Sequence, residues 1–157
     1  METKIIKKEP FTVIGMTLET LLSVEREQKN IQKLFDTFNK RIIEIENRLG
    51  DHAIGIFIDP PNYNPEADPF KWITGIEVSS SSIIPDGMES FEFPANTYAC
   101  TTYQGGRDQA HYAYDYLYSW IIDSEYELAD SYGIEIHQRQ LKDDNIIMDL
   151  MFPIRKK

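Results

Sequence analysis

The chain has 157 residues, 16 of them basic and 26 acidic, with a formal net charge of −10 at pH 7. This length suits one domain with a real core, and the negative charge disfavours direct binding to nucleic acid. A single cysteine, Cys100, excludes an internal disulfide, and no apolar run approaches the roughly 20 residues needed to span a bilayer. We therefore expect a cytoplasmic protein without a membrane segment.

The first half of the chain predicts a strand, a helix and two further strands. Apolar residues three and four apart predict an amphipathic helix over residues 31–49, with Gly50 as its left-handed C-terminal cap. The loop at 60–69 contains four prolines and is expected to be irregular. Tyr63 in this loop either closes over a ligand or has no function. The strands are predicted at residues 11–16, 54–59 and 71–79.

The second half predicts the same order of elements. A helix is expected over residues 108–122, after the break at Gly105 and Gly106, and a polar turn is expected at 142–145. The strands are predicted at residues 88–103, 132–138 and 146–154.

The two halves can be aligned with each other. Pro10-x-x-x-Ile14-Gly15 matches Pro94-x-x-x-Tyr98-Ala99, and residues 55–58 match residues 133–136. The alignment predicts an α+β fold with tandem duplicated β-α-β-β repeats, at about 1–82 and 83–157, within a single domain over 1–157. The repeats would form one antiparallel sheet with helices on one face and a ligand groove on the other. Chance similarity between short apolar strands is the alternative.

The strand around Glu135 predicts which side chains reach the groove. Period two places Ile134 and Ile136 on one side, and Glu135 and His137 on the other. We expect the isoleucines to face the helices, so that Glu135 and His137 point to the open face. Other strand residues expected on that face are Phe57, Asp149 and Met151.

Aromatic residues make up 12% of the chain, and nine of them are tyrosines. A tyrosine joins an apolar body to a polar tip, which suits the wall of a pocket. Tyr112 and Tyr116 share one side of the predicted helix. We expect one of them to line the groove with Tyr103 and Trp72, although packing in the core is the alternative for each.

One ordered set of motifs runs through nearly the whole chain. They are Trp72-x-x-Gly75-Ile76-Glu77-Val78, Phe93-Pro94-Ala95-x-x-Tyr98 with the later Gly105, residues 112–121, residues 124–128, Ile134-Glu135-Ile136 and Phe152-Pro153-Ile154. In their order and spacing these motifs resemble the GyrI-like small-molecule-binding domain, also called the AraC-type effector-binding domain.

The resemblance implies a pair of tandem β-α-β-β repeats and a ligand site. In multidrug-responsive members, an acidic residue that matches Glu135 sits in an aromatic pocket and pairs with cationic drugs. Many members are fused to a DNA-binding helix-turn-helix domain, whereas the effector domain takes up these 157 residues, so a stand-alone member is expected. Stand-alone relatives include a gyrase-inhibiting protein and enzymes that hydrolyse cyclopropane-bearing, DNA-alkylating natural products.

Three functions follow from these observations. The first is binding of hydrophobic, cationic small molecules, with Glu135 as the countercharge. The second is hydrolysis of a strained cyclopropane, with Glu135 as general base on water and Tyr103 positioning the substrate. The third is binding of a protein such as gyrase, and a homodimer is also left open. No cofactor or metal is expected, because the histidines lack metal-ligand spacing. The expected ligand-binding residues are Glu135, Phe57, Trp72, Tyr103, Tyr112, Tyr116, His137, Asp149 and Met151.

Overall fold

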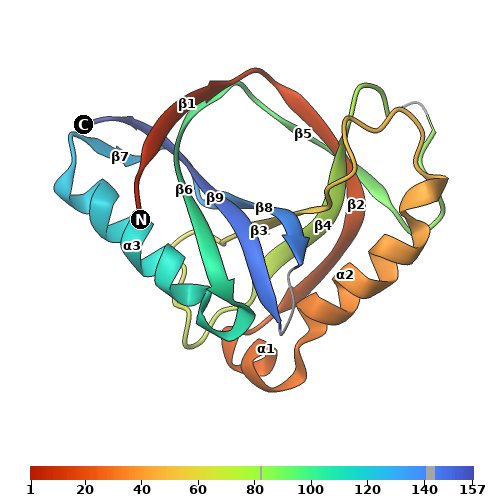
Figure 1. The fold of residues 1–157 in the computed structure, drawn as a ribbon, viewed down its shortest axis with the longest axis horizontal. Helices are drawn as coiled ribbons and strands as arrows, with labels where there is room; N and C mark the ends of the chain where they lie inside the picture. The colour runs from red at the N-terminus through yellow and green to blue at the C-terminus, as the bar shows by residue number, and fades with distance from the viewer. Residues whose placement is uncertain (82, 141–143) are drawn as a thin grey trace. The chain divides into compact units, whose positions relative to one another are not determined.

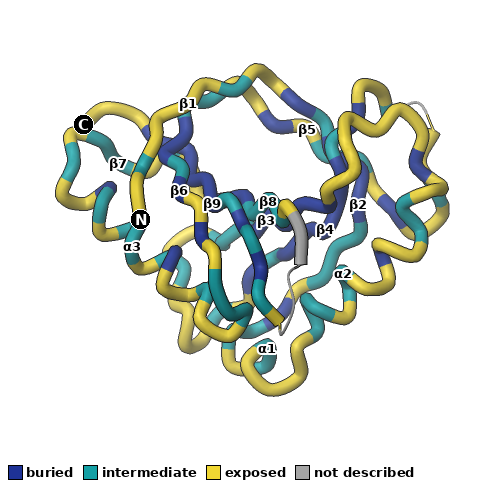
Figure 2. Tube along the Cα trace, viewed as in Figure 1, coloured by how far each residue is buried: buried dark blue, intermediate teal, exposed yellow. Residues whose placement is uncertain are grey.

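The computed structural model describes residues 1–81, 83–140 and 144–157 (Figure 1). These residues form two compact units, and each is described by itself. The continuous unit is Pro10–Pro94, and the discontinuous unit joins Met1–Glu9 to Ala95–Lys157. Figure 2 shows that the buried segments gather on the strands, whereas the helices and loops carry most of the exposed residues.

The continuous unit is an antiparallel sheet with helices between its first two strands. Its strands pair in the order β3-β4-β2-β5. The helices are α1 (Leu22–Gln28) and α2 (Asn30–Arg41), followed by the 3-10 turn η1 (Ile42–Glu44). Phe38 of α2 is fully buried in one core cluster with Ile14 and Ile76 of the sheet. The strands are β2 (Phe11–Thr20), β3 (Ile54–Ile58), β4 (Phe70–Val78) and β5 (Glu89–Phe93).

The helix predicted over residues 31–49 is too long, because α2 ends at Arg41. Beyond η1 the chain leaves the helical conformation: Ile45 is extended, Asn47 has a left-handed φ of 62°, and the amide of Leu49 donates a 2.8 Å hydrogen bond to the carbonyl of Glu77. Gly50 does adopt a left-handed φ of 101°, but it follows this irregular segment and caps no helix. The apolar spacing was misleading because Leu49 is 55% exposed.

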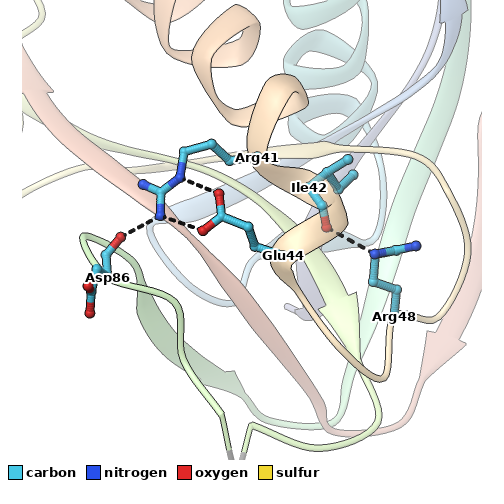
Figure 3. Close-up of polar contacts among 5 residues, drawn as sticks. All are labelled: Arg41, Ile42, Glu44, Arg48 and Asp86. Carbon is cyan, nitrogen blue, oxygen red and sulfur yellow. Dashed lines mark hydrogen bonds and ion pairs between the residues drawn. The ribbon is translucent and has the colours of Figure 1, made fainter.

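Side chains of two arginines fix the region where α2 and η1 end (Figure 3). Arg48 donates to the carbonyl oxygens of Ile42, at 3.0 Å, and Ile45, at 2.8 Å. Arg41 holds Glu44 with two hydrogen bonds, of 2.7 and 3.0 Å, and reaches the carbonyl of Asp86 at 2.8 Å. The bonds from Arg48 replace partners that a longer helix would have supplied, and those from Arg41 tie the helix end to the loop at Asp86.

The discontinuous unit repeats this strand order when it is read from the other end: β8, β9, β6 and β1 correspond to β3, β4, β2 and β5. Its strands pair antiparallel as β1-β6-β9-β8, and β7 pairs with β9. The helix α3 (His111–Asp123) follows the 3-10 turn η2 (Arg107–Gln109) and buries the predicted stripe of Ala113, Leu117 and Ile121. The strands are β1 (Lys4–Lys8), β6 (Asn96–Gly106), β7 (Tyr126–Leu128), β8 (Tyr132–Gln140) and β9 (Asn145–Lys156).

The predicted α+β class with antiparallel strands is confirmed, and the described residues hold three α-helices. One predicted strand differs, because residues 88–103 form two strands, β5 and β6, that are separated at Pro94 and Ala95. Residues 142 and 143 of the predicted polar turn lie outside the described residues.

Glu135 lies on the sheet face that α3 covers, and not on an open face as predicted. In the β8–β9 pair Glu135 is directly opposite Leu150, and such opposite residues project to the same side of a sheet. Phe152, two residues beyond Leu150 on that side, contacts α3. The expectation that Ile134 and Ile136 face the helix is therefore wrong.

Asp149 and Met151 lie on the face opposite to Glu135. Met151 pairs with Ile134, and Asp149 pairs with Ile136. The predicted surface that joined Asp149 and Met151 to Glu135 is therefore not formed on one side of the sheet. The sidedness was misread because both faces bury apolar residues: Ile134 is 2% exposed and Leu150 is 0% exposed. Period two then separates the faces without identifying which one meets the helix.

Candidate functional site

The carboxylate of Glu135 is the centre of a small polar cluster in the discontinuous unit. The hydroxyl of Tyr114 donates a hydrogen bond to Oε2 of Glu135, and Nε2 of His137 lies 2.8 Å from Oε1. The side chains of Glu135 and His137 are only 14% and 21% exposed. Both carboxylate oxygens are thus engaged inside a largely apolar layer.

Local structure explains how these three side chains meet. Glu135 and His137 are two residues apart on β8 and therefore project to the same face. Tyr114 lies on α3, one residue after the buried Ala113, which places its ring at the border of the stripe that packs on the sheet. His137 is opposite Met148 of β9, so an apolar side chain forms the floor beside the imidazole.

Aromatic rings form a wall beside this cluster. Tyr114 and Tyr118 are one helical turn apart on α3. Their ring centroids lie 5.9 and 4.5 Å from that of Phe152 on β9. A carboxylate beside three rings is chemically suited to a cation with an apolar body, because the carboxylate supplies charge and the ring faces attract cations.

Sequence reasoning missed Tyr114 and favoured its neighbours. Tyr112 is 54% exposed, and its ring lies 4.2 Å from that of His111. The hydroxyl of Tyr116 accepts a 3.2 Å hydrogen bond from Thr3. The usable signal was the spacing of Tyr114 from Leu117 and Ile121, which puts its ring on the packed side of α3.

Tyr103 is on the same face of the sheet as Glu135, through its pairing with Met148. Its hydroxyl donates a 2.6 Å hydrogen bond to the carbonyl of Gly106, and burial raises the pKa of this phenol. The hydroxyl therefore stays protonated and already has an acceptor at the start of η2.

The opposite face holds a separate polar group. Asp149 accepts hydrogen bonds from Thr102 at 2.7 Å and from Gln138 at 2.8 Å. Burial, with a contribution from the nearby Asp149, raises the pKa of the Cys100 thiol to about 12. The thiol is therefore protonated near neutral pH, which favours a packing role for Cys100 over a nucleophilic one.

Trp72 and Phe57 lie in the continuous unit, on the face covered by α2. They are opposite each other in the β3–β4 pair, and Phe35 of α2 meets the Trp72 ring edge-on at 6.1 Å. The indole is 3% exposed and donates a 2.8 Å hydrogen bond to Thr74. The described contacts of Trp72 are therefore those of a packed residue with a satisfied N–H group.

The described part of the chain shows neither a metal-ligand cluster nor a membrane-spanning helix. Over residues 1–81, 83–140 and 144–157, no three His, Cys, Asp or Glu side chains are grouped so that they could hold a metal ion. Within the same ranges, none of the helices combines the length and apolarity that crossing a bilayer requires.

The sequence matches a family of ligand-binding domains. The family model of the GyrI-like small molecule binding domain matches residues 1–155. The chain therefore belongs to the GyrI-like family, as its motifs indicated.

One curated relative is the transcriptional regulator BrlR of Pseudomonas aeruginosa. The two sequences are 28% identical over 160 residues, which cover 98% of this chain and 56% of BrlR. The chain thus spans about half the length of that relative.

Solved structures with low sequence identity share the fold. SAV2435, whose structure holds tetraphenylphosphonium, has a TM-score of 0.75 at 13% identity, with 99% of this chain and 94% of that chain covered. EcmrR in complex with DNA has a TM-score of 0.75 at 14% identity, with 99% and 58% covered. A hydrolase encoded by lin2189 of Listeria innocua has a TM-score of 0.60 at 11% identity, with 98% and 92% covered.

Proposed function

We propose that the chain binds hydrophobic organic cations, with Glu135 as the countercharge. The observation that carries the proposal is the carboxylate of Glu135, largely removed from water and placed beside the rings of Tyr114, Tyr118 and Phe152. A cation there would recover electrostatic free energy that burial of the carboxylate costs. Membership of the GyrI-like family supports the proposal, as does the tetraphenylphosphonium held by SAV2435.

Further expectations about the site belong with this proposal. Tyr103 is the next candidate contact on the Glu135 side, whereas Tyr112, Tyr116, Phe57 and Trp72 have neighbours that already explain their positions. A cytoplasmic location and the absence of direct nucleic-acid contacts also stay predictions.

The two units are proposed to derive from duplication of one β-α-β-β segment. The three core strands have the same order in each, β3-β4-β2 and β8-β9-β6, with β5 added to the first unit and β1 and β7 added to the second. Within that order β3 corresponds to β8, so that Gly55 and Phe57 take the positions of Gly133 and Glu135. The duplicated position thus carries an aromatic ring in one unit and a carboxylate in the other.

The test is calorimetric titration of the chain with tetraphenylphosphonium. Glu135→Gln keeps the shape of the side chain and removes its charge, so we expect at least a tenfold loss of affinity, about 1.4 kcal/mol. Glu125→Gln, an exposed position of the same unit, is the matched control and should bind as the unaltered chain does. Equal affinity in the Glu135 and Glu125 variants would contradict the assignment.

Hydrolysis of a cyclopropane-bearing electrophile is the second candidate. It is favoured by the contact between Nε2 of His137 and Oε1 of Glu135, because such a pair can accept a proton from an attacking water. In this reaction the water oxygen bonds to a ring carbon, the strained C–C bond breaks, and the carbanionic side takes up a proton. Mass analysis after incubation separates the functions: a water adduct formed in catalytic amounts supports hydrolysis, and unchanged compound supports binding.

A further inference from the structure

A pocket lies in the continuous unit, where the loop after β3 returns to β4. Its volume is about 520 Å³, within the range of about 300–1,000 Å³ that is usual for small-molecule sites. The ends of β2, β3 and β4 and both ends of the loop contribute to it. Its apolar wall includes Pro60, Pro61, Pro69 and Phe70.

This wall is built before any ligand arrives. The prolines restrict the backbone, and the ring of Tyr63 packs edge-on against Phe70 with a centroid distance of 6.5 Å. The amide of Asn64 donates to the carboxylate of Asp68 at 2.9 Å, and the amide of Asp68 returns a 2.8 Å bond to the carbonyl of Asn64. A preformed wall lowers the entropy cost of binding.

Some charged groups of the pocket already interact with other groups of the protein, and others do not. Asp68 is used by its own loop, and the ammonium of Lys71 lies 5.1 Å from the centre of the Phe91 ring. Glu19 is exposed at the rim. Asp59 is half-buried, and within the described ranges no donor or cation lies against its carboxylate. Burial raises the pKa of Asp59 to about 6, which indicates that its charged form lacks a partner.

We propose that this pocket is a second binding site, for a small organic ammonium compound whose nitrogen contacts Asp59 and whose apolar body lies against Pro60, Pro61 and Phe70. The carboxylate supplies the countercharge, and the aromatic and proline surfaces supply apolar contact. The net charge of −10 favours approach of a cation. This proposal stands apart from the Glu135 site and does not depend on it.

The test is a titration of the isotope-labelled chain with phenethylammonium, followed by NMR of the backbone amides. We expect saturable shifts in the millimolar range for residues 58–71. Asp59→Asn should weaken this binding at least tenfold, whereas Glu66→Gln, an exposed position in the same loop, should leave it unchanged. Phenethyl alcohol, which has the same ring without the charge, should bind at least tenfold more weakly.

Two further measurements test the role of the Asp59 charge and the independence of the two sites. The affinity for phenethylammonium should rise as the pH passes upward through about 6, because Asp59 then ionises. Asp59→Asn should leave tetraphenylphosphonium binding unchanged, so that failure of one site is distinguished from failure of the other. Absence of saturable shifts at residues 58–71, or equal binding by the Asp59→Asn chain or of the alcohol, would overturn the proposal.

Discussion

At the scale of single residues, two side-chain partners fix the orientation of the Glu135 carboxylate. The Tyr114 hydroxyl and the His137 ring each engage one carboxylate oxygen, so the group is oriented before a ligand arrives. A hydrogen bond to a charged acceptor is worth more than a neutral one, about 1.5–3 kcal/mol. The orientation of Glu135 can therefore be tested through its partners.

Replacing Tyr114 by Phe removes the donor and keeps the ring against Phe152. We expect the free energy of unfolding to fall by about 1–2 kcal/mol, because Glu135 loses a partner while it stays partly buried. Urea unfolding measures this change. Tyr112→Phe, at an exposed position, is the control and should change stability by less than about 0.5 kcal/mol. Equal stability of the two variants would rule out a role for the Tyr114 hydroxyl.

Asp59 should make the stability of the chain depend on pH, because burial raises the pKa of its carboxyl group to about 6. The folded chain then binds more protons than the unfolded chain between about pH 4 and pH 6. The stabilisation from protonated Asp59 is therefore present at acid pH and is lost as the pH rises through about 6.

Asp59→Asn should remove this dependence. At pH 7 we expect the variant to be more stable by about 1 kcal/mol, well below the full linkage value because solvent screens a half-buried carboxylate. Below about pH 4 the difference should vanish, since Asp59 is then protonated in both states. Urea unfolding at the two pH values measures both effects, and a difference that does not vary with pH would contradict them.

At the scale of elements, the close packing of the Trp72 ring on the neighbouring strand depends on Gly55. A Cβ atom at Gly55 of β3 would lie 2.2 Å from Cζ2 of Trp72 on β4. The indole ring cannot move away freely, because it packs against Phe35 and donates to Thr74. The small residue at this position thus allows the tryptophan to cover the strand.

Gly55→Ala should destabilise the chain by about 1–3 kcal/mol, because the added methyl group forces Trp72 from its site. The tryptophan emission of the folded variant should also shift, since the indole would gain exposure. Chemical unfolding followed by fluorescence measures both quantities. Unchanged stability with unchanged emission would show that the strand and ring can separate without cost.

At the scale of the whole molecule, the excess of acidic residues acts on every charged ligand. A net charge of −10 attracts cations over distances that salt shortens, from a Debye length of about 30 Å at 0.01 M to about 3 Å at 1 M. The affinity for tetraphenylphosphonium should therefore fall severalfold over this range of salt. Triphenylphosphine oxide, a neutral analogue, should be far less sensitive, and parallel titrations compare the two. Equal salt dependence would exclude a contribution from charge.

The positions of most elements could be predicted from local sequence patterns. The buried stripe of α3 and the strands around Glu135 follow from periods of 3.6 and two residues, which depend on near neighbours alone. Glu135 could also be identified as a candidate site residue, because a carboxylate between apolar strand residues is chemically unusual, and its role in binding stays a prediction. The same local method failed at Leu49, whose apolar side chain matched the helical spacing although it is exposed.

The tertiary structure decided which side of the sheet Glu135 occupies and which tyrosine meets it. Both properties depend on the pairing of β8 with β9 and on the packing of α3 against Phe152. Since apolar residues are buried on both faces, alternation in the sequence defines two sides but does not say which one the helix covers. By itself the sequence determined the family and the class of fold, and it identified Glu135 as the candidate carboxylate. The packing of α3 on the sheet, a long-range property, decided that Tyr114 is a partner of that carboxylate, whereas the proximity of His137 follows from its place two residues along the same strand.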